Sequence, residues 1–159
     1  MTADYPDTTE TSRELRELLV DAYVDELETI VNYMGIAINL DTFDGHDIAE
    51  ELLADIQEEL THAEQLGNRI RVLNGTVPLS LDEAFVLDQS GINSTHGGDD
   101  IVGVIDGVID SENKAIETYT EIASLAQEVG DHGTYQLAST LLSDEEAHRQ
   151  EFKSLRKGM

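Results

Sequence analysis

Cysteine and tryptophan are both absent from this 159-residue chain. Without thiols the chain cannot form disulfides, zinc ribbons, iron–sulfur clusters or a cysteine nucleophile, so Asp, Glu and His are the metal ligands that remain. No run of about 18 apolar residues occurs, which argues against a membrane-spanning helix. The start of the chain, Met1 to Asp4, has neither a basic nor an apolar stretch, so we expect no signal peptide and a cytoplasmic protein.

Basic residues are scarce, with nine Lys and Arg against 34 Asp and Glu, which gives a net charge of −25. Such a surface repels itself at low salt. The simplest interpretation is adaptation to the salt-saturated cytoplasm of a halophilic archaeon, where concentrated cations screen the repulsion. An acidic, partly disordered chain is the alternative, and the apolar periodicity argues against it. Because no basic patch is present to displace the counterions of DNA, we expect no nucleic-acid partner.

Apolar residues make up 40% of the chain and recur at the spacing of amphipathic helices, while strand patterns are weak throughout. We predict a mobile N-terminal tail over residues 1–10 and a single helical domain over residues 11–158. The first helix is expected to start at a capping box, Thr11 to Glu14.

Three breaks divide this domain into four helices of roughly 25–30 residues, each about 40 Å long. They lie at Asp41–Gly45, Asn74–Gly75 and Gly130–Asp131. The stretch 76–99 is the least regular part of the chain, although a short helix is possible around Leu81–Leu87. A connection this long lets the third helix run parallel to the second. The sequence therefore predicts an all-α, four-helix bundle with one long crossover between helices two and three.

Each apolar stripe is interrupted in mid-helix by a carboxylate. The interrupting residues are Glu26, Glu59, Glu112 and Glu145, one in each helix, and His62 and His148 follow three residues after the second and the fourth. A buried carboxylate is costly unless it is neutralised, paired or bound to a metal. The stripes contain no basic partners, and two imidazoles alone do not neutralise four carboxylates. Two divalent cations would balance them, so we predict a metal site formed by these six residues.

The two halves of the chain match each other at an offset of 86 residues. Glu26 and Glu59 are 33 residues apart, as are Glu112 and Glu145, and a tyrosine, Tyr33 or Tyr119, lies seven residues after the first Glu of each pair. A lone Glu-x-x-His motif is weak in so acidic a chain, but two copies with equally spaced upstream Glu residues are much more specific. The pattern indicates an internal duplication of a helix pair, in which each half supplies half of the site.

These motifs resemble the ferritin-like superfamily, in which two helices each supply a Glu and two others each supply Glu-x-x-His. The resemblance covers roughly residues 12–75 and 100–155. The stretch Glu59–Leu66 is similar to the second helix of bacterioferritins. The stretch from Glu112 to His148 resembles the second half of bacterioferritins and of archaeal Dps-like mini-ferritins.

Three departures from these families matter. Bacterioferritins have a haem-ligating Met directly after the second-helix Glu, whereas this chain has Leu60, so haem is not expected. Only 11 residues follow His148, too few for the fifth helix of the 24-subunit cage, so we expect a homo-oligomer that is a dodecamer or a dimer. The cysteine pair of archaeal thiol-bearing Dps-like proteins is absent.

The resemblance implies a di-iron ferroxidase that oxidises Fe(II) with O2 or H2O2 for iron storage, detoxification and defence against oxidative stress. Glu59 and Glu145 would bridge the two metals, Glu26 and Glu112 would be terminal ligands, and His62 and His148 would add one nitrogen each. Carboxylate and imidazole ligands suit iron or manganese. Tyr33 and Tyr119 would hydrogen-bond near the ligands or supply an electron, although they can also be read as core aromatics.

Two other functions stay open. One is a dimanganese or rubrerythrin-like peroxidase or catalase on the same fold, and the other is a non-catalytic, metal-binding structural oligomer. Among the remaining histidines, His46 and His132 match at the same offset and are expected at the surface near helix starts. His96, in the long connection, is not favoured as part of an iron access path.

Overall fold

The computed structural model describes residues 10–40, 45–79 and 100–159, which form four long helices and no strand. In chain order the helices are α1 (Glu10–Asn39), α2 (His46–Val72), α3 (Ile101–Val129) and α4 (His132–Lys157). The all-α prediction is confirmed. Within the described ranges, none of the helices is both long and apolar enough to span a membrane.

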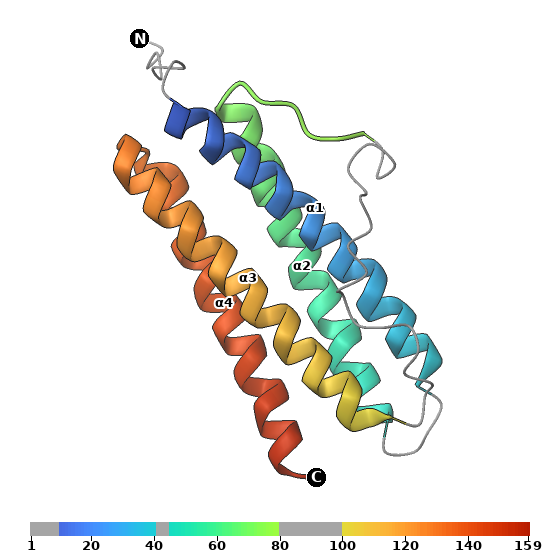
Figure 1. Cartoon of the computed structure of the whole chain (residues 1–159). Coiled ribbons are helices and arrows are strands. Elements are labelled where there is room, and N and C mark those ends of the chain that lie inside the picture. Colours follow the sequence, from blue (N-terminus) through green and yellow to red (C-terminus); the bar gives the residue numbers. More distant parts are fainter. Residues whose placement is uncertain (1–9, 41–44, 80–99) are drawn as a thin grey trace.

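The helices form two antiparallel pairs, α1 with α2 and α3 with α4, which pack against each other through α1–α3 and α2–α4 contacts. Figure 1 shows that α2 and α3 run in the same direction, as expected for a bundle with one crossover. The predicted tail covers residues 1–10, of which 1–9 lie outside the described residues, while Glu10 is already part of α1. The predicted short helix at 81–87 also lies outside the described residues.

The helices α2 and α3 end at the Asn-Gly and Gly-Asp breaks that the sequence predicts. Asn74, after the end of α2, has a positive φ of 60°, and the N–H of Gly75 donates to the carbonyl of Ile70 at 2.8 Å. Gly130 ends α3 with φ 75°, a left-handed conformation that glycine adopts without strain. One prediction was wrong, because Glu10 is already helical and Thr11 does not cap the helix. The hydroxyl of Thr11 instead donates to Glu128 of α3 at 3.5 Å.

A partly buried ion pair joins the end of α2 to the start of α4. Arg69 donates to Asp131, the N-cap residue of α4, and also to the hydroxyl of Thr134 at 2.7 Å. Gly133 leaves room for the guanidinium, since a Cβ there would lie 2.8 Å from a terminal nitrogen of Arg69. Burial raises the pKa of Asp131, but hydrogen bonds from Arg69 and Thr134 outweigh it and hold the pKa below its usual value.

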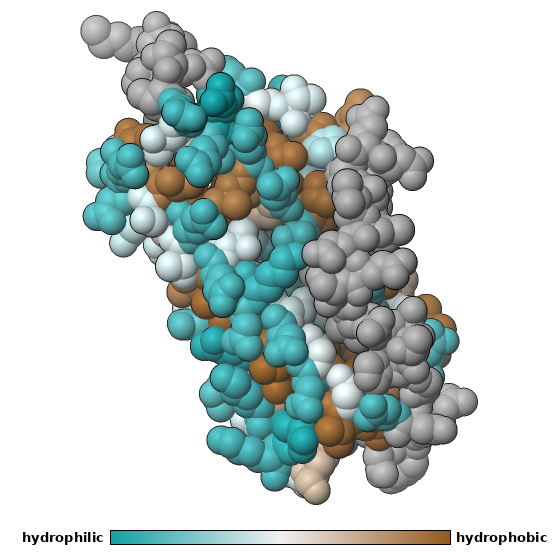
Figure 2. All heavy atoms as spheres, viewed as in Figure 1, coloured by the Kyte–Doolittle hydropathy of each residue, from teal (hydrophilic) through white to brown (hydrophobic). Residues whose placement is uncertain are grey.

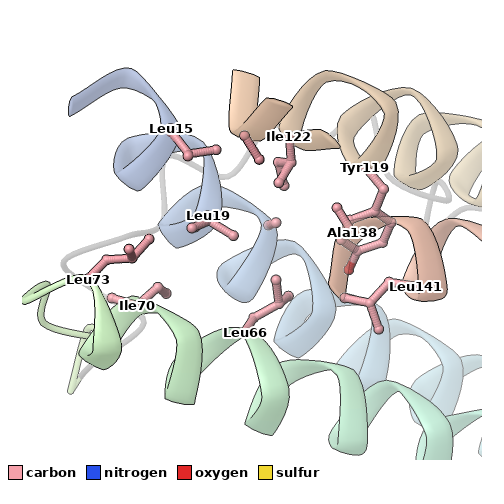
Figure 3. Close-up of a cluster of buried hydrophobic side chains, with 11 residues drawn as sticks. Leu15, Leu19, Leu66, Ile70, Leu73, Tyr119, Ile122, Ala138 and Leu141 are labelled. Carbon is pink, nitrogen blue, oxygen red and sulfur yellow. The ribbon is translucent and has the colours of Figure 1, made fainter. Parts of the chain in front are cut away.

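Two clusters of buried apolar side chains fill the two ends of the bundle. The first apolar cluster (Figure 3) is formed by Leu15, Leu19, Ala22, Leu66, Ile70, Leu73, Tyr119, Ile122, Ala126, Ala138 and Leu141. The second apolar cluster is formed by Tyr33, Ala37, Leu40, Ile48, Ala49, Leu52, Ile56, Val104, Ile105, Val108 and Phe152. Several of their members correspond at the offset of 86 residues, as Leu19 does with Ile105 and Leu66 with Phe152. Others do not, since Ile70 is matched by Arg156 and Leu141 by Asp55. The internal duplication thus appears in the packing as two related cores, and the residues between them are polar.

Candidate metal centre

Six buried side chains occupy the middle of the bundle between the two apolar clusters. They are Glu26 from α1, Glu59 and His62 from α2, Glu112 from α3, and Glu145 and His148 from α4. None is more than 6% exposed. The structure therefore brings together all six residues that the sequence predicts as ligands, and we call them the six-residue centre.

The centre divides into two overlapping groups of possible ligands. Glu26, Glu59, His62 and Glu145 form one group, and Glu59, Glu112, Glu145 and His148 form the other. Within each group, donor atoms lie within 4.8 Å of one another. Glu59 and Glu145 belong to both groups, so the geometry suits two cations side by side with these two carboxylates between them.

The two imidazoles turn the same nitrogen toward the centre. Nδ1 of His62 lies 3.1 Å from carboxylate oxygens of both Glu59 and Glu145. Nδ1 of His148 lies 3.2 Å from Glu145 and 3.6 Å from Glu59. The ring centroids are 6.3 Å apart with an interplanar angle of 26°. This common orientation leaves both Nε2 atoms facing outward.

An acidic side chain meets each outward nitrogen. Nε2 of His62 lies 3.5 Å from Asp144, and Nε2 of His148 lies 3.0 Å from Glu58. Acceptors in these positions favour the imidazole tautomer that carries its proton on Nε2 and leaves Nδ1 free to bind a cation. Glu58 is hydrogen-bonded to His148 in this way, and Asp144 lies on the corresponding side of His62.

The two tyrosines that the sequence places near the ligands make crossed hydrogen bonds between the helix pairs. Tyr33 of α1 donates to Glu112 of α3, and Tyr119 of α3 donates to Glu26 of α1. Both tyrosines are at most 1% exposed. Burial, and then the neighbouring carboxylate, raises the pKa of each phenol well above its usual value, so both hydroxyls stay protonated donors.

Without cations, the protons of the centre are distributed unevenly. Burial raises the pKa of Glu26, and it raises that of Glu112 to about 9 with help from the charge of Glu145. Burial opposes ionisation of Glu59 and His62 too, but hydrogen bonds with His148 and His62 lower the pKa of Glu59. Hydrogen bonds with Glu145 and Glu59 raise the pKa of His62 to about 10. The corresponding pair behaves alike, since the pKa of His148 is raised to about 12. Cations entering the centre would displace these protons.

The donor set fits a pair of divalent metal ions. One oxygen of Glu145, Oε1, is buried; Nδ1 of His62 lies 3.1 Å from it, but no contact in the described part of the chain gives it a well-formed hydrogen bond. A buried oxygen of this kind has a strong need for a positive neighbour. Four carboxylates and two imidazoles, with no thiolate, suit iron or manganese.

The other sequence-predicted positions lie away from the centre. His46 is a surface residue, 3.4 Å from Glu50 of the next turn, and His132 is exposed. The side chain of Leu60 is 54% exposed on the outside of α2. His96 lies outside the described residues.

Sequence reasoning missed three acidic residues beside the centre. Glu58 and Asp144 correspond at the offset of 86 residues, a signal that would have found them. Asp55, four residues before Glu59 and one turn away on the same helix face, has its Oδ1 4.0 Å from Nε2 of His148. Asp55 has no acidic counterpart in the other half of the chain, because the matching residue is Leu141.

Solved structures of similar shape come from ferritin-like proteins. A dodecameric thioferritin, the bacterioferritin-related protein of Bacteroides fragilis, superposes with a TM-score of 0.83 and 26% identity, over 92% of this chain and 86% of that one. The bacterioferritin of Desulfovibrio desulfuricans, described as having a diiron site, gives a TM-score of 0.76 and 25% identity over 93% of this chain and 81% of that one. Dps from Thermosynechococcus elongatus shares the fold at 19% identity and a TM-score of 0.80, over 91% and 90% of the two chains.

Sequence comparison also identifies ferritin-like relatives. The bacterioferritin of Desulfovibrio desulfuricans is 28% identical over 132 residues, which cover 83% of this chain and 68% of that protein. The family model of the ferritin-like domain matches residues 16–158, nearly the whole chain. The bundle, its duplicated helix pairs and these matches together show that the chain belongs to the ferritin family.

Proposed function

We propose that the six-residue centre is a ferroxidase site that binds two Fe(II) ions and oxidises them to Fe(III). The observation that carries the proposal is the paired donor set itself, four carboxylates and two imidazoles buried between two apolar clusters. Membership of the ferritin family supports iron as the metal. The product Fe(III) would be stored or passed on, so the activity would serve iron storage and detoxification.

Each ligand has a distinct role in this proposal. Glu59 and Glu145 would hold both ions, because both residues belong to both ligand groups. Glu26 and His62 would complete one site, while Glu112 and His148 would complete the other. Both histidines would bind through Nδ1, which is the nitrogen that faces the carboxylates.

The surrounding side chains hold the ligands in place. Tyr33 and Tyr119 fix the two terminal glutamates from the opposite helix pair, and Glu58 and Asp144 fix the imidazoles from outside. The apolar clusters keep water away from both ends of the centre. Two Fe(II) ions lose one electron each, and one O2 gains both electrons and two protons to give H2O2. With H2O2 as the oxidant, the same two electrons and two protons give two water molecules.

The chain is proposed to work as a homo-oligomer. One similar protein is described as dodecameric, which supports a dodecamer, with a dimer as the smaller possibility. Exposed apolar side chains on α1 and α2 offer surface for contacts between subunits: Val31, Met34, Ile38, Leu53 and Leu60. The oligomeric state is measured by light scattering in molar KCl.

We further propose that the protein works in the concentrated salt of a halophilic cytoplasm. Hydrophilic residues cover most of the described surface on the face shown in Figure 2, and the net charge is −25. Mutual repulsion between these charges is screened within about 3 Å at 1 M salt but only within about 10 Å at 0.1 M. We expect the melting temperature to fall as KCl is lowered from about 1 M to 0.1 M. A melting temperature that does not change with salt would contradict this adaptation.

The ferroxidase proposal is tested by adding two Fe(II) per subunit to metal-free protein in molar KCl. Oxygen consumption and near-ultraviolet absorbance are followed, with Glu59→Ala as the inactive variant and Glu146→Ala as the matched control. Glu146 is exposed and lies next to Glu145 outside both ligand groups. We expect a fast rise that saturates near two irons per subunit in the wild type and the control, and no rise in Glu59→Ala.

Other outcomes distinguish the alternatives. If none of the three proteins oxidises Fe(II), the ferroxidase proposal is wrong. Manganese in the protein as isolated, together with breakdown of H2O2, would then indicate the dimanganese peroxidase or catalase. Bound metal without either activity would indicate a structural metal site.

A further inference from the structure

A second group of carboxylates lies next to the six-residue centre, on the outer side of His148. Glu51 and Asp55 come from α2, and Glu151 comes from α4, one turn after His148. One oxygen from each of these three residues lies within 4.8 Å of the others. Glu151 is exposed and Glu51 is partly exposed, so the group is open to solvent on one side, whereas Asp55 closes it on the inside.

Asp55 is the unusual member of this group, because it is a nearly fully buried acid. It is 4% exposed, and its Oδ2 is enclosed with no hydrogen-bond partner among the described residues. Its other oxygen faces His148 at 4.0 Å, too far for a hydrogen bond. Burial raises the pKa of Asp55 to about 7. An orphaned carboxylate oxygen costs free energy that a bound cation would recover.

The duplicated half of the chain shows that the fold does not need these acids. At the offset of 86 residues, Glu51 corresponds to Leu137 and Asp55 to Leu141, while Glu151 corresponds to Gln65. Leu141 is fully buried in the first apolar cluster. The position of Asp55 can therefore be filled by a hydrocarbon side chain in an equivalent bundle environment. A structural requirement for charge does not account for the group.

We propose that Glu51, Asp55 and Glu151 bind a third divalent cation beside the centre. Carboxylate oxygens alone suit a hard cation such as Mn(II), Fe(II), Mg(II) or Ca(II). Oxygens on opposite sides of such a cation are about 4–5 Å apart at ordinary bond lengths. The three oxygens of this group lie within 4.8 Å of one another, close enough to share one cation. Three ionised carboxylates would more than offset a double positive charge, and none of them forms an ion pair with Lys or Arg in the described ranges.

The position of the site suggests what it does. Because Asp55 lies beside His148, a cation held there is one side chain away from the centre and also within reach of solvent at Glu151. Fe(II) would bind transiently at this site before it moves into the six-residue centre. This use depends on the ferroxidase function proposed above, whereas binding of the cation does not.

The experiment counts Mn(II) ions bound per subunit by the loss of the free Mn(II) signal in electron paramagnetic resonance. Metal-free protein is titrated at about pH 8 in molar KCl, which suppresses loose binding to the acidic surface. We expect three ions in the wild type and two in Glu151→Gln and in Asp55→Asn. Glu151 is exposed, so its substitution leaves the core intact even if Asp55→Asn disturbs folding. Glu146→Gln, which removes an exposed charge from the same helix, is the matched control and should keep three.

Two results of this titration overturn the third site. One is a wild type that binds only two Mn(II) ions, and the other is a loss in Glu146→Gln equal to that in Glu151→Gln. Anomalous diffraction from crystals soaked in MnCl2 gives a second reading, in which a peak between the three carboxylates supports the site and its absence contradicts it. A wild type that binds three Mn(II) but never oxidises Fe(II) would refute the ferroxidase and leave the third site standing.

Discussion

Asp55 and Leu141 occupy matching places in the two halves of the bundle, yet one is a carboxylate and the other a hydrocarbon. Around them the halves agree closely. Each contributes a terminal glutamate, a Glu-x-x-His pair, a tyrosine that reaches across, and an acid behind the histidine. Asp55 is buried beside the second apolar cluster, and Leu141 is buried inside the first.

This difference distinguishes features that both halves of the six-residue centre share from features that occur in one half of the chain only. Features present in both halves would serve the two proposed cation sites, because a symmetric pair of ions would impose the same requirements on each half. A feature present in one half alone points to a function that only one side of the centre performs. A path for cations that opens on one side only would be such a feature, and it would explain why a costly buried acid stands at Asp55 and not at position 141.

The largest effect is expected from removing either bridging carboxylate. Glu59→Gln and Glu145→Gln should each lower the rate of Fe(II) oxidation by at least about 100-fold, and to a similar extent, because both residues serve both cations. Stopped-flow absorbance after mixing with two Fe(II) per subunit measures both rates. A large loss in one variant beside a near-normal rate in the other would break the equivalence of the two halves.

Exchanging the unmatched residues should shift stability in opposite directions. Leu141→Asp places a carboxylate in the first apolar cluster and should destabilise the metal-free protein by about 3–5 kcal/mol. Asp55→Leu gives the first half the residue of the second and should stabilise it by about 1–3 kcal/mol. Urea unfolding in molar KCl measures both free energies. Destabilisation by Asp55→Leu would mean that the two environments are not equivalent.

The buried acid should also give the metal-free protein a pH dependence that a neutral residue lacks. The pKa of Asp55 is about 7 in the folded chain, above its unfolded value of about 3.9, so the native state holds the proton more tightly. Stability from this group is full below about pH 4 and is lost as the pH rises through about 7. Relative to Asp55→Asn, the wild type should lose about 2–4 kcal/mol between pH 4 and pH 8. Parallel unfolding curves for the two proteins at both pH values would refute this linkage.

The smallest effect is expected at the crossed tyrosines. Tyr33→Phe and Tyr119→Phe each remove one hydrogen bond to a terminal glutamate and leave the ring packing in place. Each should slow Fe(II) oxidation by about tenfold, near the lower end for residues that orient metal ligands. Single-turnover rates for both variants test whether the pair is equivalent. A much larger loss in only one variant would indicate that this tyrosine supplies an electron in addition to its hydrogen bond.

The fold and the members of the centre were predictable because two periodicities coincide in the sequence. The helical spacing of apolar residues identifies the buried face of each helix. The repeat at an offset of 86 residues places glutamates at matching positions in both halves of the chain. The helical spacing also assigns the matching pair Ile30 and Ile116 to the buried face, although both are only partly buried. Membership of the family is shown, while binding of metal by the six residues stays a prediction.

What the sequence did not predict depends on contacts between helix pairs. Asp55 looks like one more solvated acid among 34 acidic residues, and only the packing of α4 against α2 buries it next to His148. The hydrogen-bond acceptors of Tyr33 and Tyr119 could not be predicted either. The spacing of residues along one helix does not show which glutamate of another helix a tyrosine hydroxyl will contact. Thr11 is a residue type that often caps helices, but α1 begins before it. Its hydroxyl donates to Glu128 of α3 instead.

The crossed tyrosine–glutamate bonds bear on how the chain folds. They join residues 79 and 93 positions apart, whereas each helix pair is held mainly by contacts within itself. Local helix pairs form readily, but each then carries a central carboxylate whose hydroxyl donor is on the other pair. Docking of the two pairs supplies the hydroxyl donors that these buried carboxylates need. We therefore expect neither half of this duplicated chain to fold stably alone, even though both halves repeat the same pattern of glutamates, histidine and tyrosine.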